Sequence, residues 1–206
     1  MINTVIFDIG NVLIDVDFMR SIRSYTNTDE EAKRCFLAFV KNKTWDLLDK
    51  GTYSTEEVMK KFIENDPEME MYMRAFFDGM KDLLLPFSFT NSWIESIKKD
   101  GKKVYILSNW PQFVHKKFAK EMDFLEKADG YLLSYIEKLT KPDPAYYQLL
   151  LDRYLLKAEE CVFVDDRKEN VEAAKAKGMV GILFENREQV EQDLKKLGVE
   201  IYGPIA

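Results

Sequence analysis

The stretch INTVIFDIGNVLIDVDF, residues 2–18, indicates both the fold and the place of a site. Its β-branched and aromatic run from Val5 to Phe7 is typical of a short buried parallel strand. The run ends at an acid, Asp8, with Gly10 close behind. Open α/β sheets bind ligands in the crevice beyond the carboxyl ends of their strands, so Asp8 is a candidate functional residue. A solvated turn aspartate has the same local pattern, and this stretch alone leaves both interpretations open.

Apolar runs and helical patterns alternate through the second half of the chain. We expect further buried strands within KKVYILSNW, GYLLSYI, CVFVDDRKEN and VGILF, which begin at residues 102, 130, 161 and 180. Helical patterns lie between and after them, at about residues 88–99, 112–120, 144–154, 171–178 and 188–197. This alternation predicts an α/β fold: a Rossmann-like, three-layer parallel sheet with helices on both faces.

The segment between Phe18 and Pro86 has a different pattern. Strand signals stop there, and apolar residues recur every three or four positions, which predicts helices. We therefore expect a core domain of residues 1–17 and 86–206 with a helical cap, residues 18–85, inserted after the first strand. The methionines and phenylalanines of residues 69–80 are expected to pack in the core of this cap. Phe18, Trp45 and Tyr53 are expected at its core or interface, or as substrate walls.

Composition excludes several classes of function. The 206 residues carry a formal net charge of −6, which gives no field that would attract nucleic acid. No apolar run approaches the roughly 20 residues that span a bilayer, and no basic region with a long apolar stretch opens the chain. The two cysteines are single and far apart, and His115 is the one histidine, so a disulfide framework and a histidine zinc site are not expected. A cytoplasmic protein without nucleic-acid or membrane partners is the expectation.

Polar residues follow the predicted strands at several points that should converge on one crevice. They are Asp8, Ser108 with Asn109, and Asp165 with Asp166, and a loop lysine, Lys141, can reach the same edge. Three carboxylates suit a hard cation such as Mg²⁺, which takes one or two carboxylates together with substrate phosphate. A hydroxyl, backbone amides and a lysine suit the phosphate itself. A carboxylate beside Mg²⁺ can then act as the nucleophile and form an aspartyl phosphate.

The order of these motifs resembles the haloacid dehalogenase superfamily of hydrolases, in its phosphatase type. FDIGNVLIDVDF resembles the first family motif, ILSNW the second, the lysine of KLTKPDP the third and FVDDRKEN the fourth. The helical insertion stands where this superfamily places its C1 cap. The Gly-Asn pair and the D-x-D-F tail of the first motif are most similar to bacterial phosphatases acting on α-D-glucose 1-phosphate and to the N-terminal phosphatase domain of soluble epoxide hydrolases.

The resemblance implies a role for each matching residue. Asp8 would be the nucleophile and a Mg²⁺ ligand, and the backbone carbonyl of Gly10 would also bind the metal. Asp166 would be a direct ligand and Asp165 would act through water or a hydrogen bond, while Asn170 would orient their loop.

The same resemblance implies how the substrate is held. Ser108, the amide of Asn109 and the Lys141 ammonium would bind the phosphoryl group of a small phosphorylated substrate. Lys141 would also offset the crowded negative charge of the acids. Neither the substrate nor the choice between monomer and homodimer follows from these motifs.

Two further interpretations stay open. Dehalogenases of the superfamily share the aspartate nucleophile and work without metal, but the Asp165–Asp166 pair argues for a cation between the acids. A noncatalytic member that binds a phosphorylated metabolite or a protein partner is the third.

One departure from the family pattern generates a prediction. Most phosphatases of the superfamily carry a general acid two residues after the nucleophile, where this chain has Gly10. Asp15 and Asp17 in the first motif, and His115 one helix turn past Asn109, are the other candidate donors. Without a placed donor, poor leaving groups should react roughly 10²- to 10⁴-fold more slowly. Unless a residue outside the motifs supplies this proton, we expect p-nitrophenyl phosphate to be hydrolysed much faster than a simple alkyl phosphate. Equal turnover of the two would contradict a site without a donor.

Overall fold

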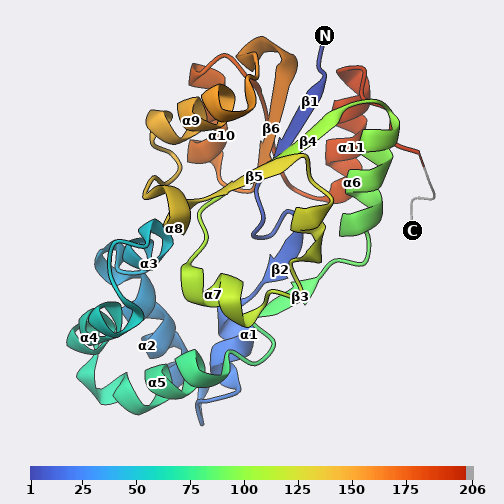
Figure 1. The fold of residues 1–206 in the computed structure, drawn as a ribbon. Coiled ribbons are helices and arrows are strands. Elements are labelled where there is room, and N and C mark those ends of the chain that lie inside the picture. Colours follow the sequence, from blue (N-terminus) through green and yellow to red (C-terminus); the bar gives the residue numbers. More distant parts are fainter. Residues whose placement is uncertain (203–206) are drawn as a thin grey trace.

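The computed structural model describes residues 1–202, and a five-stranded parallel sheet forms its core (Figure 1). The sheet contains β1 (Thr4–Phe7), β4 (Lys103–Ser108), β5 (Gly130–Leu133), β6 (Cys161–Asp165) and β7 (Val180–Leu183), in the order β5-β4-β1-β6-β7. The central strand places Phe7 in register with Ile106 of β4 and Val164 of β6. Because helices cover both faces of the sheet at this central strand, its side chains are buried on both faces and its run is apolar throughout. The predicted α/β parallel sheet is confirmed.

Helices cover both faces of this sheet. On one side lie α6 (Thr90–Lys99) and α11 (Arg187–Lys196), and on the other α9 (Pro144–Tyr154) and α10 (Lys168–Ala176) (Figure 1). Successive side chains of a strand point to opposite faces, so Phe7 packs on the Trp93 ring of α6 at 4.7 Å between centroids. Ile6 belongs to the apolar cluster on the other face, with Tyr147 of α9.

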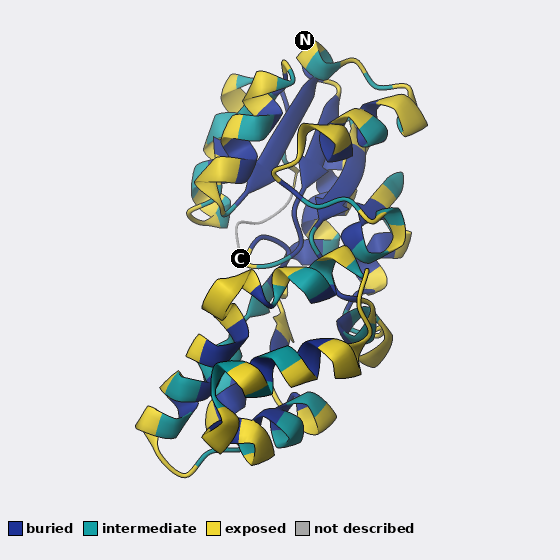
Figure 2. Ribbon diagram, turned by 90° about the vertical axis from the view of Figure 1, so that its left-hand side faces the viewer, coloured by how far each residue is buried: buried dark blue, intermediate teal, exposed yellow. Residues whose placement is uncertain are grey.

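Five helices make up the insertion that follows β1: α1 (Phe18–Arg23), α2 (Asp29–Val40), α3 (Asp46–Lys50), α4 (Thr55–Asn65) and α5 (Glu70–Gly79). Thr28 and Ser54 each open a helix with a capping box, in which side chain and backbone satisfy each other's hydrogen bonds. Figure 2 shows the buried faces of these helices turned toward one another. Met73 and Phe76 are fully buried there, as the sequence predicted, whereas Met71 is 69% exposed.

A two-stranded antiparallel ribbon stands at the base of the insertion and was not predicted. Its strands are β2 (Ile14–Val16) and β3 (Leu84–Pro86), with Val16 opposite Leu84. The expectation that strand signals stop between Phe18 and Pro86 was therefore wrong for β3. Three residues are too few to show alternation, and the pairing joins segments that are far apart in sequence.

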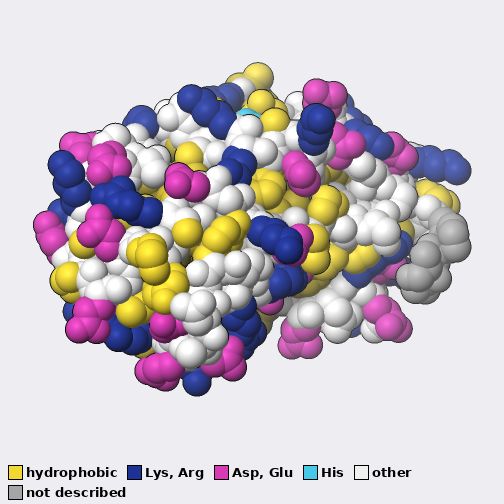
Figure 3. All heavy atoms as spheres, turned by 90° about the horizontal axis from the view of Figure 1, so that it is seen from below, with side chains coloured by type: hydrophobic (Ala, Val, Ile, Leu, Met, Phe, Trp, Pro, Cys, Tyr) yellow, Lys and Arg dark blue, Asp and Glu magenta, His cyan; other side chains and the backbone are white. Residues whose placement is uncertain are grey.

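The remaining elements are short. They are α7 (Gln112–Lys117), which ends three residues earlier than predicted, α8 (Ser134–Glu137), and 3₁₀ turns at Lys41–Lys43, Pro67–Met69, Asp123–Glu126 and Ala158–Glu160. Within residues 1–202 no helix has the length and apolar character needed to cross a bilayer. The face seen in Figure 3 carries acidic and basic side chains that are interspersed.

The insertion contacts the core at the carboxyl ends of the strands. Helix α3 lies beside α8 in Figure 1, and two hydrogen bonds join them. The Ser134 hydroxyl donates to the carbonyl oxygen of Asp49 at 2.5 Å, and the Lys138 ammonium donates to the carbonyl oxygen of Gly51 at 2.5 Å. These contacts bring α3 over the crevice in which the strand-end residues converge.

The aromatic centre of the insertion leads to a stability prediction. Phe39 of α2 is 1% exposed, and its ring contacts those of Trp45, Phe62 and Phe76. Phe39→Ala should lower the free energy of unfolding by about 3–5 kcal/mol, because it removes buried surface and leaves a cavity. Urea denaturation followed by circular dichroism measures this loss.

Leu37→Ala is the matched control, since Leu37 lies on the same helix and is 60% exposed. Its effect should stay within about 0.5 kcal/mol. Equal losses in the two variants would contradict the assignment of Phe39 to the core.

Candidate active site

Asp8 lies directly after β1, in the middle of the sheet edge. Its backbone N–H donates to the carbonyl oxygen of Val164 at 2.9 Å, which continues the sheet pairing by one residue. The carboxylate oxygen Oδ1 accepts hydrogen bonds from the Ser108 hydroxyl at 2.6 Å and the Lys141 ammonium at 2.7 Å. Asp8 is only 8% exposed, so the donors at the end of β4 and in the loop before α9 fix its carboxylate in a buried position.

Lys141 is placed between two carboxylates. Its ammonium is 2.7 Å from Asp8 and 2.6 Å from Asp165, and its side chain is 1% exposed. The Asn109 side chain holds the lysine backbone through two hydrogen bonds, donating to its carbonyl at 2.9 Å and accepting from its N–H at 2.7 Å. The second and third motifs are thus joined, which explains how a loop lysine reaches the sheet edge.

The acidic pair at the end of β6 has two different environments. Asp165 is fully buried and accepts hydrogen bonds from the Arg167 N–H at 2.8 Å and from the Asn170 amide at 2.9 and 3.1 Å. Asp166 is partly exposed and accepts one from the Asn11 amide at 3.2 Å. Asn11 has a positive φ of 58°, a conformation that asparagine tolerates better than most residues.

Three of these acids form a cluster that fits a divalent cation. Carboxylate oxygens of Asp8, Asp165 and Asp166 lie within 4.8 Å of one another. With all groups ionised, three carboxylates and the Lys141 ammonium leave a formal charge of −2, which a divalent ion would balance. Oxygen donors of this kind are the ligands that Mg²⁺ prefers.

The electrostatics reflect this crowding. Burial raises the pKa of Asp8 to about 6, although Lys141 opposes the rise. Burial also raises the pKa of Asp166, against the hydrogen bond from Asn11. Burial alone would lower the pKa of Lys141, but the charges of Asp165 and Asp8 raise it, so the lysine stays an ammonium.

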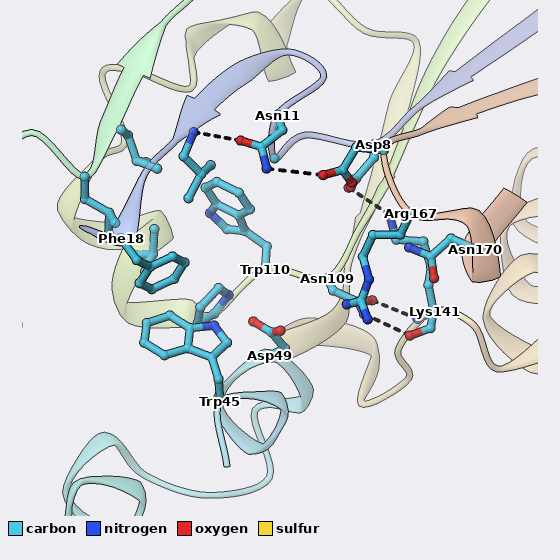
Figure 4. Close-up of a pocket in the computed structure, with 17 residues that line it drawn as sticks. Asp8, Asn11, Phe18, Trp45, Asp49, Asn109, Trp110, Lys141, Arg167 and Asn170 are labelled. Atoms are coloured by element: carbon cyan, nitrogen blue, oxygen red, sulfur yellow. Dashed lines mark hydrogen bonds and ion pairs between the residues drawn. The ribbon is translucent and has the colours of Figure 1, made fainter. Parts of the chain in front are cut away.

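A cavity of about 170 Å³ opens at this cluster. In Figure 4, Asp8, Asn109 and Lys141 reach it from the core, while Phe18, Trp45 and Asp49 reach it from the insertion. A second cavity of about 710 Å³ continues outward and shares Phe18, Trp45, Asp49, Asn109, Lys141 and Arg167 with the first. Its outer wall adds the aromatic rings of Phe36 and Phe39. The site therefore combines a polar, acidic floor with aromatic walls.

The structure brings together all the strand-end residues that the sequence singled out. Gly10, the predicted carbonyl ligand, lines the inner cavity as well. Phe18 and Trp45 line it, whereas Tyr53 is 44% exposed and lies elsewhere, at a separate surface hollow. The roles that the resemblance implies for these residues stay predictions.

The candidate proton donors named from the sequence are not in this cavity. Asp15 pairs with Arg20 at 2.6 Å, and Asp17 caps α1 by accepting from the Arg20 N–H at 2.8 Å. His115 shares a hydrogen bond with the Tyr135 hydroxyl at 2.9 Å. None of the three lines either cavity.

Sequence reasoning missed two charged residues that do line the cavity, Asp49 and Arg167. Asp49 lies in a short helix of the insertion, and nothing in its sequence neighbourhood distinguishes it from a surface acid. Arg167 directly follows the acidic pair, so its position in the sequence could have predicted that it lies beside the site.

Comparison with known proteins agrees with this geometry. A model of haloacid dehalogenase-like hydrolases matches residues 2–178. The chain belongs to this family. The resemblance inferred from the sequence is therefore confirmed.

Several members of the family are similar over most of this chain. Flavin mononucleotide hydrolase 1 of Arabidopsis thaliana is 26% identical over 78% of this chain, which spans 64% of that protein. The sesquiterpene phosphatase astK of Aspergillus oryzae is 28% identical over 86% of this chain and 87% of its own length. A family enzyme of Bacteroides thetaiotaomicron, crystallised with magnesium and inorganic phosphate, superposes with a TM-score of 0.68 at 20% identity, over 92% of this chain and 99% of its own. These similarities are to phosphatase-type members of the family.

The buried ion cluster generates a pH-dependent prediction. Lys141→Met leaves Asp8 and Asp165 without a counter-charge and should lower the free energy of unfolding by about 3–5 kcal/mol at pH 8. A carboxyl with a raised native pKa holds its proton to higher pH than in the unfolded chain, so native stability falls as pH rises from about 4 to 6. The loss should therefore be smaller at pH 5, where Asp8 can be neutral.

Denaturant unfolding in the presence of a chelator at the two pH values measures the effect. Lys116→Met is the control, because Lys116 is exposed. A loss of stability that is the same at pH 5 and pH 8 would contradict the charge argument.

Proposed function

We propose that this protein is a Mg²⁺-dependent phosphomonoester hydrolase that acts on a small phosphorylated metabolite through an aspartyl phosphate at Asp8. The observation that carries the proposal is the position of the Asp8 carboxylate, at the floor of a cavity and within hydrogen-bonding distance of Ser108 and Lys141. The names of the relatives from Arabidopsis thaliana and Aspergillus oryzae, a flavin mononucleotide hydrolase and a sesquiterpene phosphatase, support it.

The contacts of Asp8 favour one of its oxygens as the nucleophile. Ser108 and Lys141 both contact Oδ1, which fixes the carboxylate plane and leaves Oδ2 as the oxygen that attacks phosphorus. As the new bond to phosphorus forms, the ester P–O bond breaks and the leaving oxygen takes up a proton. Water then attacks the aspartyl phosphate, which returns the Asp8 carboxylate and releases inorganic phosphate.

The phosphoryl group needs positive groups around its oxygens as charge moves onto the leaving atom. Ser108, the backbone amide of Asn109 and the Lys141 ammonium would hold these oxygens, since they lie at the end of β4 and in the two loops that meet at Asp8. Lys141 is fixed by Asp165 and by Asn109, so little reorganisation is needed when the substrate binds.

The metal would be held by Asp8, Asp165, Asp166 and the backbone carbonyl of Gly10. Among the described residues, Asp165 already accepts hydrogen bonds from three groups, whereas Asp166 accepts one, from Asn11. This difference favours Asp166 as the direct ligand and Asp165 as the acid that acts through water or a hydrogen bond. When bound, Mg²⁺ would neutralise charge on the nucleophile and on the phosphoryl oxygens.

A sugar phosphate is the proposed substrate class. The inner cavity of about 170 Å³ suits a small group. Its aromatic walls, Trp45 and Phe18, can pack on the apolar face of a sugar ring, while Asp49 and Arg167 can bind hydroxyl groups. The metal-independent dehalogenase interpretation is less well supported, because three clustered carboxylates would repel an anionic haloacid.

Phosphate release tests the proposal directly. We expect release from a panel of sugar phosphates and p-nitrophenyl phosphate with Mg²⁺, and loss of release with a chelator. Asp8→Asn should reduce turnover to background, because an amide cannot form the aspartyl phosphate. A colorimetric phosphate assay measures both.

Asp152→Asn, at an exposed acid of α9, is the control and should retain wild-type turnover. Folded protein that releases no phosphate across the panel would favour a noncatalytic binding role. Turnover that persists with the chelator, together with halide release from a haloacid, would favour the dehalogenase interpretation.

A further inference from the structure

The reaction proposed above needs a proton at the leaving oxygen, and the core provides no carboxyl at the position where the family usually has one. Gly10 occupies that position. Asp15, Asp17 and His115 are bound elsewhere, as described above. Among the described residues that line the inner cavity, Asp49 is the one acid that does not belong to the metal cluster.

Asp49 is positioned by the insertion but fixed to the core. It lies in α3, and its carboxylate points into the cavity in Figure 4. The Ser134 hydroxyl donates to its backbone carbonyl at 2.5 Å and accepts from the Trp110 N–H at 2.8 Å. Trp110 directly follows Asn109, so a single hydroxyl connects the acid of the insertion to the loop that follows β4.

The approach of α3 to the core is close. Gly51, two residues after Asp49, has a φ of 65°, and a Cβ added there would lie 2.9 Å from the Cα of Tyr135. Only glycine allows both this backbone conformation and this contact. The end of α3 is thus held against α8, and these contacts fix the backbone of Asp49 beside the cavity.

We propose that Asp49 is the general acid and base of the reaction, and this inference rests on the proposed phosphatase function. Its protonated carboxyl donates to the leaving oxygen as the ester P–O bond breaks. The resulting carboxylate then accepts a proton from the water that attacks the aspartyl phosphate. Each turnover returns Asp49 to its starting form, with no other co-reactant.

The charges around Asp49 are consistent with both steps. Burial raises its pKa to about 7, Asp46 on the same helix adds to the rise, and Arg167 from the core opposes it. Asp8 contributes a smaller rise, and Lys141 and Asp166 are the other charged groups that line the same cavity. A donor with a pKa near the working pH is efficient in both directions of proton transfer.

The role of Asp49 is tested with two substrates that differ in their need for a proton. The leaving group of p-nitrophenyl phosphate departs as a stable anion, whereas that of an alkyl phosphate must be protonated. Asp49→Asn should lower the ratio of alkyl to p-nitrophenyl turnover by about 10²- to 10⁴-fold. The wild-type rate with the alkyl phosphate should fall above about pH 7, and the variant should lose this dependence.

Asp46→Asn is the matched control. It removes the same charge from the same helix, at an exposed residue, and should keep the substrate ratio while moving the fall in rate to lower pH. Asp49→Ala provides a second variant if the asparagine variant does not fold, because Ser134 still reaches the backbone carbonyl.

A ratio that Asp49→Asn leaves unchanged, in an active protein, would overturn the role of Asp49. A wild-type enzyme that hydrolyses the alkyl phosphate at least about 10²-fold more slowly than p-nitrophenyl phosphate would overturn it as well, because this ratio is expected of a site without a donor. Wild-type protein that hydrolyses neither substrate would instead overturn the phosphatase function itself.

Thermal unfolding gives a readout that does not depend on turnover. An acid whose native pKa is raised above its unfolded value of 3.8 makes the fold less stable as pH rises toward 7. The melting temperature of Asp49→Asn should therefore fall less between pH 5 and pH 8 than that of the wild type. Identical falls would show that Asp49 does not titrate in the cavity, which contradicts the proposal.

Discussion

The buried ammonium of Lys141 between Asp8 and Asp165 is the interaction on which the site depends. Removing charges from water is costly, and a buried pair is tolerated only when its geometry and its other hydrogen bonds are good. Here each acid has a further donor, Ser108 for Asp8 and Asn170 for Asp165. The lysine backbone is in turn held by Asn109. The strand ends therefore form one connected network, and a change at any member reaches the Asp8 carboxylate.

The division of work between core and insertion follows from this network. In the proposed reaction, the core would provide the parts that every phosphate ester uses: nucleophile, phosphoryl contacts and acidic cluster. The insertion adds aromatic walls and one acid to the cavity, and these would meet the part of the substrate that differs between compounds. The hydrogen bonds that hold α3 against α8 are accepted by backbone carbonyls of Asp49 and Gly51. Side chains of the insertion can therefore change without removing these contacts with the core.

The core of the site was predictable from the sequence for a simple physical reason. Parallel strands end at one edge of a sheet, so the polar residues that terminate apolar runs, such as Asp8 and Ser108, must meet there. Asp49 and the β2–β3 ribbon were not predictable in this way, because both depend on contacts between segments that are distant in sequence. Asp15 and His115 show the converse, since their closeness to the motifs in sequence does not bring them to the cavity.

Asn11 has two contacts that join the acidic cluster to the base of the insertion. Its amide nitrogen donates to Asp166, and its amide oxygen accepts from the N–H of Val16 at 3.1 Å. Val16 belongs to β2, the strand through which the chain leaves the core for the helices. The side chain therefore connects the acidic cluster to the strand through which the chain enters the insertion. While both hydrogen bonds hold, Asp166 and β2 keep a fixed separation.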